Sequence, residues 1–260
     1  MHTFVICAYK ESLYLEECIR SLINQNVKST IKMVTSTPNS YIQSLAVKYD
    51  IPLVVNQGEA GIVQDWNFGL EQCTTPYVTI AHQDDLYYES YAKVAIQELN
   101  KRKTPLIFFA NYNELWGEEP KKSSVLLEFK RMMLFVLRFK KLQKCIFLRR
   151  RILSFGNAIC CPSVTYAMKN LPHPIFTIGF RSNQDWETWE RLSALPGDFI
   201  YYPKRLMSHR IHKESETSKM ISEQLRIKED YKMFCKFWHP RVAKILAKGY
   251  STSERFNQRD

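Results

Sequence analysis

The chain has 260 residues, a net charge of +11, 45% hydrophobic residues and 24% charged residues. This composition is typical of a globular protein and excludes long disorder, and the length allows one large α/β domain or two small domains. The start, Met1 to Cys7, has no basic stretch and no small-residue cleavage site, so we expect a first strand there and no signal peptide. The seven cysteines show no CxxC pair and no metal-ligand spacing, which indicates reduced thiols in the cytosol.

The first part of the chain alternates strand-like and helix-like segments, which predicts an α/β fold with a mostly parallel central sheet flanked by helices. Runs of β-branched and aromatic residues predict strands, and apolar residues at helical spacing predict helices. The predicted strands are residues 3–8, 31–35, 53–55, 77–81 and 106–110. The predicted helices are residues 12–24, 41–49, 62–72 and 89–101.

The second part contains fewer clear elements. We predict a strand over residues 163–168, a helix that begins near residue 183, a short strand over 199–202 and an amphipathic helical region over 223–248. Because the sequence has no internal repeat and no low-complexity linker, the simplest organisation is one domain over residues 1–222, followed by a helical tail over residues 223–260.

Two adjacent carboxylates follow the strand predicted at residues 77–81. Asp84 and Asp85 would stand at the carboxyl end of that strand, which is the edge of an α/β sheet where ligands bind. Their hard oxygens suit Mg²⁺ or Mn²⁺, which proteins hold through one or two carboxylates together with a substrate's phosphates. The alternative is a turn whose aspartates cap the next helix. On this segment alone both interpretations stay open.

The positive charge is concentrated in one segment. From Phe129 to Gln184 there are eleven Lys or Arg residues and no Asp or Glu. Basic clusters alternate there with apolar blocks, so we predict a basic amphipathic segment over residues 129–152 that contacts an anionic membrane surface. A solvated face packed on the core is the alternative, and nucleic acid is not expected as a partner. The expected membrane-contacting cations are Lys140, Lys141, Arg149, Arg150 and Arg151.

Five blocks of the sequence, in this order, resemble the family-2 glycosyltransferases and their GT-A nucleotide-sugar fold. They are Ala8-Tyr9-Lys10-Glu11 with Leu15, Ile19 and Gln25; Asn56 with Gly61 and Asn67-Phe68-Gly69-Leu70; His82-Gln83-Asp84-Asp85; Gln184-Asp185-Trp186-Glu187; and Arg210-Ile211-His212 with Ser215 and Thr217. The resemblance covers roughly residues 3 to 217. The sequence departs from the family pattern at two places. His82 stands where an Asp usually begins the DXD motif, and the turn 35–37 lacks the Asp that often contacts the nucleotide base.

The resemblance implies an inverting transfer of a sugar from a nucleoside-diphosphate sugar to a hydroxyl of a glycan or lipid-linked acceptor, in cell-surface polysaccharide or glycolipid synthesis. It implies Mg²⁺ or Mn²⁺ as cofactor, with Asp84 and His212 as metal ligands. Residues 1–110 would form the nucleotide-sugar-binding half and residues 111–222 the acceptor-binding half. The residues expected to contact the nucleotide sugar are Ala8, Tyr9, Glu11, Thr35, Ser36, Asp65, Asn67, His82, Gln83 and Asp84.

This chemistry needs a base, because the acceptor hydroxyl must lose a proton as it attacks. Asp185 is the candidate, since the amide of Gln184 cannot take a proton; the alternative for Asp185 is a helix cap. His212 is either a ligand of the metal or diphosphate, or an ordinary surface or core histidine. A catalytically inactive nucleotide-sugar-binding protein is the competing function, which His82 favours and the presence of both Asp84 and Asp185 opposes. We expect the protein in the cytoplasm, peripheral on the inner face of the membrane.

Overall fold

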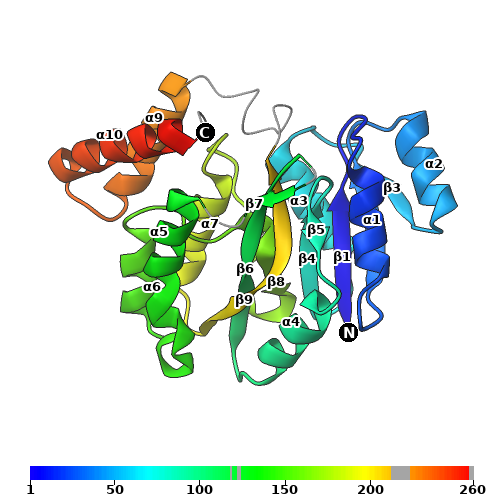
Figure 1. The fold of residues 1–260 in the computed structure, drawn as a ribbon, viewed down its shortest axis with the longest axis horizontal. Helices are drawn as coiled ribbons and strands as arrows, with labels where there is room; N and C mark the ends of the chain where they lie inside the picture. The colour runs from blue at the N-terminus through cyan, green and yellow to red at the C-terminus, as the bar shows by residue number, and fades with distance from the viewer. Residues whose placement is uncertain (118, 122–123, 212–222, 258–260) are drawn as a thin grey trace.

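The computed structural model of the chain describes residues 1–117, 119–121, 124–211 and 223–257 (Figure 1). Within them, nine strands form one sheet in the order β3-β2-β1-β4-β8-β6-β9-β5, with β7 beside β6. The strands are β1 (His2–Cys7), β2 (Thr30–Thr35), β3 (Leu53–Val55), β4 (Tyr77–His82), β5 (Leu86–Tyr87), β6 (Pro105–Trp116), β7 (Glu119–Lys121), β8 (Val164–Ala167) and β9 (Asp198–Ile211). Pairing is parallel from β3 through β4, and β8 then runs antiparallel to both β4 and β6.

Helices cover both faces of this sheet and close it against solvent (Figure 1). They are α1 (Leu15–Ile23), α2 (Ser40–Lys48), α3 (Ile62–Glu71), α4 (Tyr91–Asn100), α5 (Val125–Leu134), α6 (Ile146–Leu153), α7 (Gln184–Ser193), α9 (Glu223–Cys235) and α10 (Pro240–Asn257). Local chemistry fixes several ends: the side chain of Asn39 accepts a hydrogen bond from Ile42 N and caps α2. A Cβ on Gly69 of α3 would lie 3.0 Å from Val5, so glycine there lets α3 pack closely on β1.

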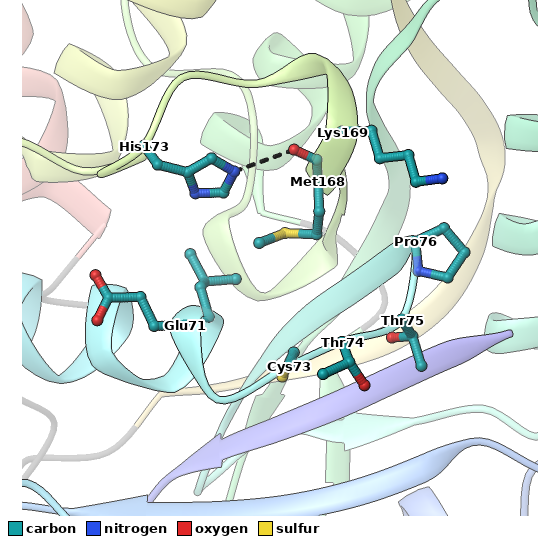
Figure 2. Close-up of a pocket in the computed structure, with 9 residues that line it drawn as sticks. Glu71, Cys73, Thr74, Thr75, Pro76, Met168, Lys169 and His173 are labelled. Atoms are coloured by element: carbon teal, nitrogen blue, oxygen red, sulfur yellow. Dashed lines mark hydrogen bonds between the residues drawn. The ribbon is translucent and has the colours of Figure 1, made fainter.

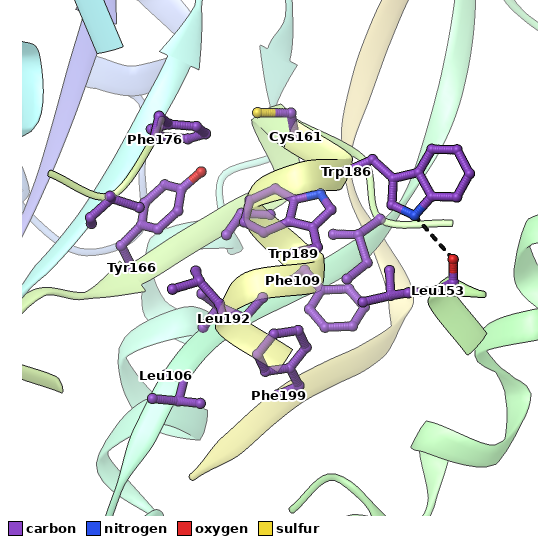
Figure 3. Close-up of a cluster of buried hydrophobic side chains, with 14 of the residues drawn as sticks. Leu106, Phe109, Leu153, Cys161, Tyr166, Phe176, Trp186, Trp189, Leu192 and Phe199 are labelled. Carbon is purple, nitrogen blue, oxygen red and sulfur yellow. Dashed lines mark hydrogen bonds between the residues drawn. The ribbon is translucent and has the colours of Figure 1, made fainter. Parts of the chain in front are cut away.

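Alternation along β1 divides the core into two clusters. Phe4 and Ile6 face one side of the sheet with α1 and α4, while Val5 faces the other side with α3 and α7. The second cluster is rich in aromatic rings, among them Trp186 and Trp189 (Figure 3). Phe234 of α9 belongs to it, so the C-terminal helices pack into this core. The division of the chain at residue 222 nevertheless stays a prediction.

The α/β fold with its central sheet is confirmed, and the predicted strands fall within a residue or two of β1 to β4 and β8. Two strands are longer than predicted: β6 continues to Trp116 and β9 to Ile211. Strands β6 and β9 stay paired through register shifts near Asn111, beyond the runs of β-branched and aromatic residues on which the prediction relied. The short strands β5 and β7 were not predicted.

Two helical predictions need correction. The basic segment 129–152 is not one amphipathic helix, because α5 ends at Leu134 and short 3-10 turns over Phe135–Arg138 and Lys140–Leu142 separate it from α6. The region 223–248 is two helices, since Pro240 has no N–H to continue a helix and begins α10 instead. In the described part of the chain, none of the helices combines the length and the apolarity needed to cross a membrane.

Candidate active site

Four parallel strands deliver polar residues to one edge of the sheet. Because β1, β2, β3 and β4 are parallel, the segments that follow them lie at the same edge. Tyr9 N donates to Gln83 Oε1 at 2.9 Å, and Gln83 Nε2 donates back to Tyr9 O at 3.0 Å. Lys10 takes a positive φ of 53° in the same turn, and its N–H donates to Thr37 Oγ1 at 2.7 Å. The loops after β1, β2 and β4 are therefore tied together.

Asp65 on α3 extends this network to the ends of β2 and β3. Its carboxylate accepts hydrogen bonds from Ser36 Oγ at 2.6 Å and from Asn56 Nδ2 at 2.8 Å. Thr35 is buried beside them, and Ala8 N donates to Val34 O at 2.9 Å. Of the residues expected to contact the nucleotide sugar, this edge brings together Ala8, Tyr9, Thr35, Ser36, Asp65, His82, Gln83 and Asp84.

Two of the residues expected to contact the nucleotide sugar lie apart from this network. Asn67 uses both ends of its amide on the backbone of Phe176, with Asn67 Nδ2 donating to Phe176 O at 2.8 Å and Phe176 N donating to Asn67 Oδ1 at 3.0 Å. Asn67 thus anchors the loop before α7. Glu11 is exposed. The binding role of both residues stays a prediction.

The end of β4 carries a compact set of possible metal ligands. Ligand atoms of His82, Asp84 and Asp85 lie within 4.8 Å of one another. The His82 ring stacks on Trp66 with centroids 5.4 Å apart. Burial lowers the pKa of His82 even though Asp85 and Asp84 act in the opposite direction, so the imidazole is neutral at neutral pH and able to bind a metal.

These residues fit a divalent cation. His82 Nε2 and Asp85 Oδ2 are buried and have no hydrogen-bond partner among the described residues, which is a costly arrangement unless a ligand satisfies them. Two carboxylates and a neutral imidazole are a donor set that Mn²⁺ or Mg²⁺ accepts. His212, the other expected ligand, lies outside the described residues.

Asp85 joins the metal-ligand set to β9. It is fully buried, and its Oδ1 accepts from His209 Nδ1 at 2.9 Å and from Arg210 N at 2.8 Å. Burial alone would lower the pKa of His209, but the Asp85 carboxylate outweighs it and raises that pKa to about 9. His209 is therefore a charged partner of Asp85 at neutral pH, a role that the sequence analysis did not assign. The sequence alone could not show that His209 meets Asp85, because the contact depends on the pairing of β9 with β5.

The Arg210 side chain links three segments at this edge of the sheet. Its guanidinium donates to Asp84 O at 3.0 Å, to Gly117 O at 2.9 Å and to Glu17 Oε2 at 2.5 Å. Only 3% of the residue is exposed. The loop that carries Asp84 is thus fixed from the β9 side.

Asp185 stands at the first turn of α7. One carboxylate oxygen accepts from Asn157 Nδ2 at 2.6 Å and the other from Trp186 N at 2.7 Å. Burial raises the pKa of Asp185, and the hydrogen bonds from Asn157 and Trp186 oppose that rise. The charges of Lys130 on α5 and of His82 also act on the pKa of Asp185, though less than burial and these hydrogen bonds do.

Glu187, the nearest other acid on α7, is already occupied. Its carboxylate accepts from Thr177 Oγ1 at 2.7 Å and pairs with Lys236 at 3.1 Å. Asp185 therefore stays the candidate base of this motif.

The loop before Asp185 is held by α9. Glu229 accepts from Arg181 N and Ser182 N, each at 2.8 Å, and Asp230 accepts from Asn183 Nδ2 at 2.8 Å. Glu229 and Asp230 are both buried. Their role could not be predicted from the sequence, because nothing in a helix of mixed polarity indicates that its acids reach a loop more than forty residues earlier.

A pocket of about 350 Å³ lies elsewhere (Figure 2). Thr74, Thr75 and Pro76 line it just before β4 begins, together with Met168 and His173. It is therefore at the amino end of β4, at the opposite edge of the sheet from Asp84. None of the residues expected to bind the donor lines it.

The parallel strands β1 to β4 end in an acidic turn that fits a metal, and the antiparallel strand β8 joins them to a mixed second half of the sheet. With the further acid on α7, this is the arrangement of a GT-A glycosyltransferase. The sequence pattern of Glycosyl transferase family 2 matches residues 3–165. That is more than half of the chain, and the chain belongs to this family. A search of curated protein sequences finds no match.

Solved structures share this fold at low sequence identity. TarS 1–349 of S. aureus in complex with UDP-GlcNAc has a TM-score of 0.63 and 12% identity, covering 95% of this chain and 70% of TarS 1–349. The mannosyltransferase PcManGT of Pyrobaculum calidifontis with GDP-Man and Mn²⁺ has a TM-score of 0.60 and 15% identity, covering 96% and 69%. Glucosyl-3-phosphoglycerate synthase of Mycobacterium tuberculosis with Mn²⁺ and UDP-glucose has a TM-score of 0.53 and 12% identity, covering 83% and 73%.

Proposed function

We propose that this glycosyltransferase moves a sugar with inversion from a nucleoside-diphosphate sugar to an acceptor hydroxyl, with Asp84 at the metal and Asp185 as the base. The observation that carries the proposal is the meeting of two separate acidic centres. The His82, Asp84 and Asp85 set lies at the end of β4, and Asp185 on α7 interacts electrostatically with its His82. One centre suits the leaving diphosphate and the other suits the attacking hydroxyl.

The donor half of the proposal rests on the network at the sheet edge. The loops after β1 and β2 bring Tyr9, Thr35 and Ser36 to this edge, where hydrogen bonds to Gln83 and Asp65 hold Tyr9 and Ser36 in place. The turn 35–37 carries no acid that would select the base of a nucleoside bound there. Asp84 and His82 would hold Mg²⁺ or Mn²⁺. When bound, such an ion neutralises the negative charge that develops on a departing diphosphate. The structures bound to UDP-GlcNAc, GDP-Man and UDP-glucose support donors of this class for the fold.

The base half rests on Asp185. Its carboxylate removes the proton from the acceptor hydroxyl while the oxygen attacks the sugar carbon from the face opposite the diphosphate, so a single displacement inverts that carbon. Because burial raises its pKa, the carboxylate is a stronger base than an exposed aspartate. Asn157 and Trp186 N orient it through their hydrogen bonds.

The acceptor is proposed to be a glycan or a lipid-linked glycan of cell-surface polysaccharide or glycolipid synthesis. We place the protein in the cytoplasm, peripheral on the membrane. The exposed apolar and basic residues of α5 and the turns after it support the membrane contact. The seven cysteines are free thiols, which supports a reducing compartment.

The test is a screen of nucleoside-diphosphate sugars for thermal stabilisation and hydrolysis, each with and without Mn²⁺. Ligand binding to the native state raises stability as ln(1 + [L]/Kd), so a true donor gives a metal-dependent rise in Tm and release of the nucleoside diphosphate. Stabilisation without any hydrolysis or transfer would favour an inactive nucleotide-sugar-binding protein. The feature that supports this alternative is His82, which stands where the family usually has an Asp. Absence of both responses for every base and sugar would refute the proposal.

A further inference from the structure

An apolar ridge runs along α5 and the turns after it. It consists of the side chains of Val125, Phe129, Met132, Phe135 and Phe139, whose exposed fractions are 85%, 46%, 64%, 51% and 57%. Their spacing of three or four residues places them along one side of the helix and its continuation. Leu127 and Leu134, on the opposite side of α5, are buried and anchor it in the core. The ridge therefore faces away from the protein.

The same helix borders the proposed active site. Arg131 donates to Tyr112 O at 2.9 Å, which fixes α5 against β6. The Tyr112 ring lies edge-on to the His209 ring, with centroids 6.3 Å apart, and His209 bonds Asp85 at 2.9 Å. α5 is thus connected through only two side chains to the metal-ligand set.

Lys130 lies on α5 between the exposed ridge and the buried side of the helix. It is half-buried, and it interacts electrostatically with both Asp185 and His209. Within the described part of the chain it makes no ion pair, whereas its neighbour Arg131 pairs with Glu128. A lysine near a reaction centre that is not held in an ion pair by the described residues is suited to bind an anionic group of a substrate.

Lys130 and the ridge belong to one continuous surface. On a helical wheel at 100° per residue, Leu126 and Met133 fall between Lys130 and Phe129, and both are partly exposed. Arg138 extends the pattern, since its guanidinium lies 5.4 Å from the centre of the Phe135 ring. From Phe129 to Gln184 the sequence holds no acidic residue, so an anionic surface meets no repulsion from this segment.

We propose that α5 is the acceptor-docking helix of this enzyme and that the acceptor is a lipid-linked glycan with an anionic group, such as a phosphate, close to the reacting hydroxyl. The ridge enters the boundary of a membrane and holds the lipid portion, while Lys130 binds the anionic group and brings the hydroxyl to Asp185. Apolar contact and charge thus act at neighbouring positions of one helix. This inference rests on the proposed function, because it places the acceptor at the same base.

The ridge is tested with vesicles. Wild type should bind vesicles of phosphatidylcholine with phosphatidylglycerol and bind pure phosphatidylcholine poorly, with release as salt rises. Val125→Ser with Phe129→Ser should weaken binding about tenfold or more, since two apolar side chains lose their burial in the interface. Val47→Ser is the matched control, because Val47 on α2 is 83% exposed and far from α5 in sequence. Equal effects of the ridge and control variants, or equal binding to both vesicles, would overturn the proposal.

The role of Lys130 is tested with three probes. Farnesyl phosphate carries both a lipid tail and a phosphate, farnesol carries only the tail, and inorganic phosphate carries only the charge. Farnesyl phosphate should raise Tm, and Lys130→Gln should reduce its affinity about tenfold or more while the weaker affinity for farnesol stays unchanged. Lys93→Gln, on the exposed side of α4, should change neither. Inorganic phosphate that binds as tightly as farnesyl phosphate, or an unaltered affinity in Lys130→Gln, would overturn the lipid-phosphate assignment. Mn²⁺-dependent binding of a nucleoside diphosphate is followed in every variant, because its loss would count against the proposed function and not against the docking helix.

Discussion

Asn183 donates a hydrogen bond to Asp230 at 2.8 Å, and this contact joins α9, the first of the two C-terminal helices, to the loop that leads into Asp185. Glu229, the preceding residue of α9, accepts the backbone N–H groups of Arg181 and Ser182. The C-terminal helices therefore set the path of the chain immediately before the proposed base. A catalytic carboxylate depends on such support, because small displacements from the productive geometry reduce rates strongly.

Loss of the Glu229 contact should slow transfer without weakening donor binding. We expect Glu229→Ala to lower kcat by about 10- to 100-fold with the KM for the donor unchanged, because the donor loops lie on β1 to β4. Glu229→Gln should recover part of the rate, since an amide oxygen still accepts a hydrogen bond. Lys228→Gln on the exposed side of α9 is the control. If donor KM rises in parallel with the fall in kcat, the helix supports the whole fold and has no special relation to Asp185.

Asp84→Ala should abolish metal-dependent binding of a nucleoside diphosphate and leave the protein folded. Asp84 is partly exposed in a turn, so its side chain is not part of the packed core. Calorimetric titration of the nucleotide with and without Mn²⁺, together with the thermal transition, measures both effects. Glu89→Ala, an exposed acid five residues further on, should bind as wild type does. An Asp84→Ala protein with unchanged metal dependence would move the ion to other ligands.

Asp185→Asn should separate chemistry from binding. The amide keeps the shape of the side chain but cannot take a proton, so we expect transfer to fall by about 10²- to 10⁴-fold while donor affinity is retained. Glu187→Gln serves as the comparison, and because Glu187 pairs with Lys236 its loss should mainly affect stability. Transfer that survives in Asp185→Asn and disappears in Glu187→Gln would reassign the base.

The pH dependence of kcat should report the environment of Asp185. The residue acts as a base only when deprotonated, and burial raises its pKa, so kcat should fall toward acid pH at a value above the ~3.9 of an ordinary aspartate. Asn157→Ala removes a hydrogen bond that favours the charged carboxylate, and this acidic limb should then move to higher pH. Asn100→Ala, on the exposed end of α4, should leave the profile unchanged. A limb that stays in place or moves to lower pH in Asn157→Ala would exclude Asp185 as its origin.

Much of the fold, and the positions of several candidate site residues, followed from local patterns. The strand that ends at His82 was visible as a β-branched run, and the acids after it were visible as neighbours in sequence. Parallel topology then placed Tyr9, Ser36 and Gln83 at the same edge, because successive strands of an α/β fold point the same way. Such features depend on short stretches of chain and on general rules of chain connection.

The remaining part of the site depends on contacts between distant segments. His209 meets Asp85 because β9 pairs with β5 in a register that no local pattern specifies. The role expected of His212, which lies outside the described residues, stays a prediction. Asn67 binds the backbone of Phe176, more than a hundred residues further along the chain, a contact that no local pattern indicates, and its expected role at the nucleotide sugar stays a prediction. The partners of an amide or a carboxylate are chosen by the whole fold, whereas the sequence shows only that such a partner is needed.

Arg149 shows the same limit for charge, and it gives a prediction on stability. The sequence placed it on a basic surface, but only 1% of it is exposed, and its guanidinium donates to Ser193 O at 2.8 Å, to Gly197 O at 2.6 Å and to Leu195 O. Burial lowers the pKa of Arg149 to about 10, so it remains charged at neutral pH and closes the end of α7.

Arg149→Ala would leave these buried carbonyls without a donor and open a cavity beside Phe199, so we expect the free energy of unfolding to fall by roughly 3–5 kcal/mol. Lys141→Ala, at an exposed position of the same basic segment, should change it by less than about 0.5 kcal/mol. Urea denaturation of the two variants measures both values. If Arg149→Ala were as mild as Lys141→Ala, Arg149 would be a surface cation after all, and the vesicle binding expected from the sequence would have to be tested with Arg149 included.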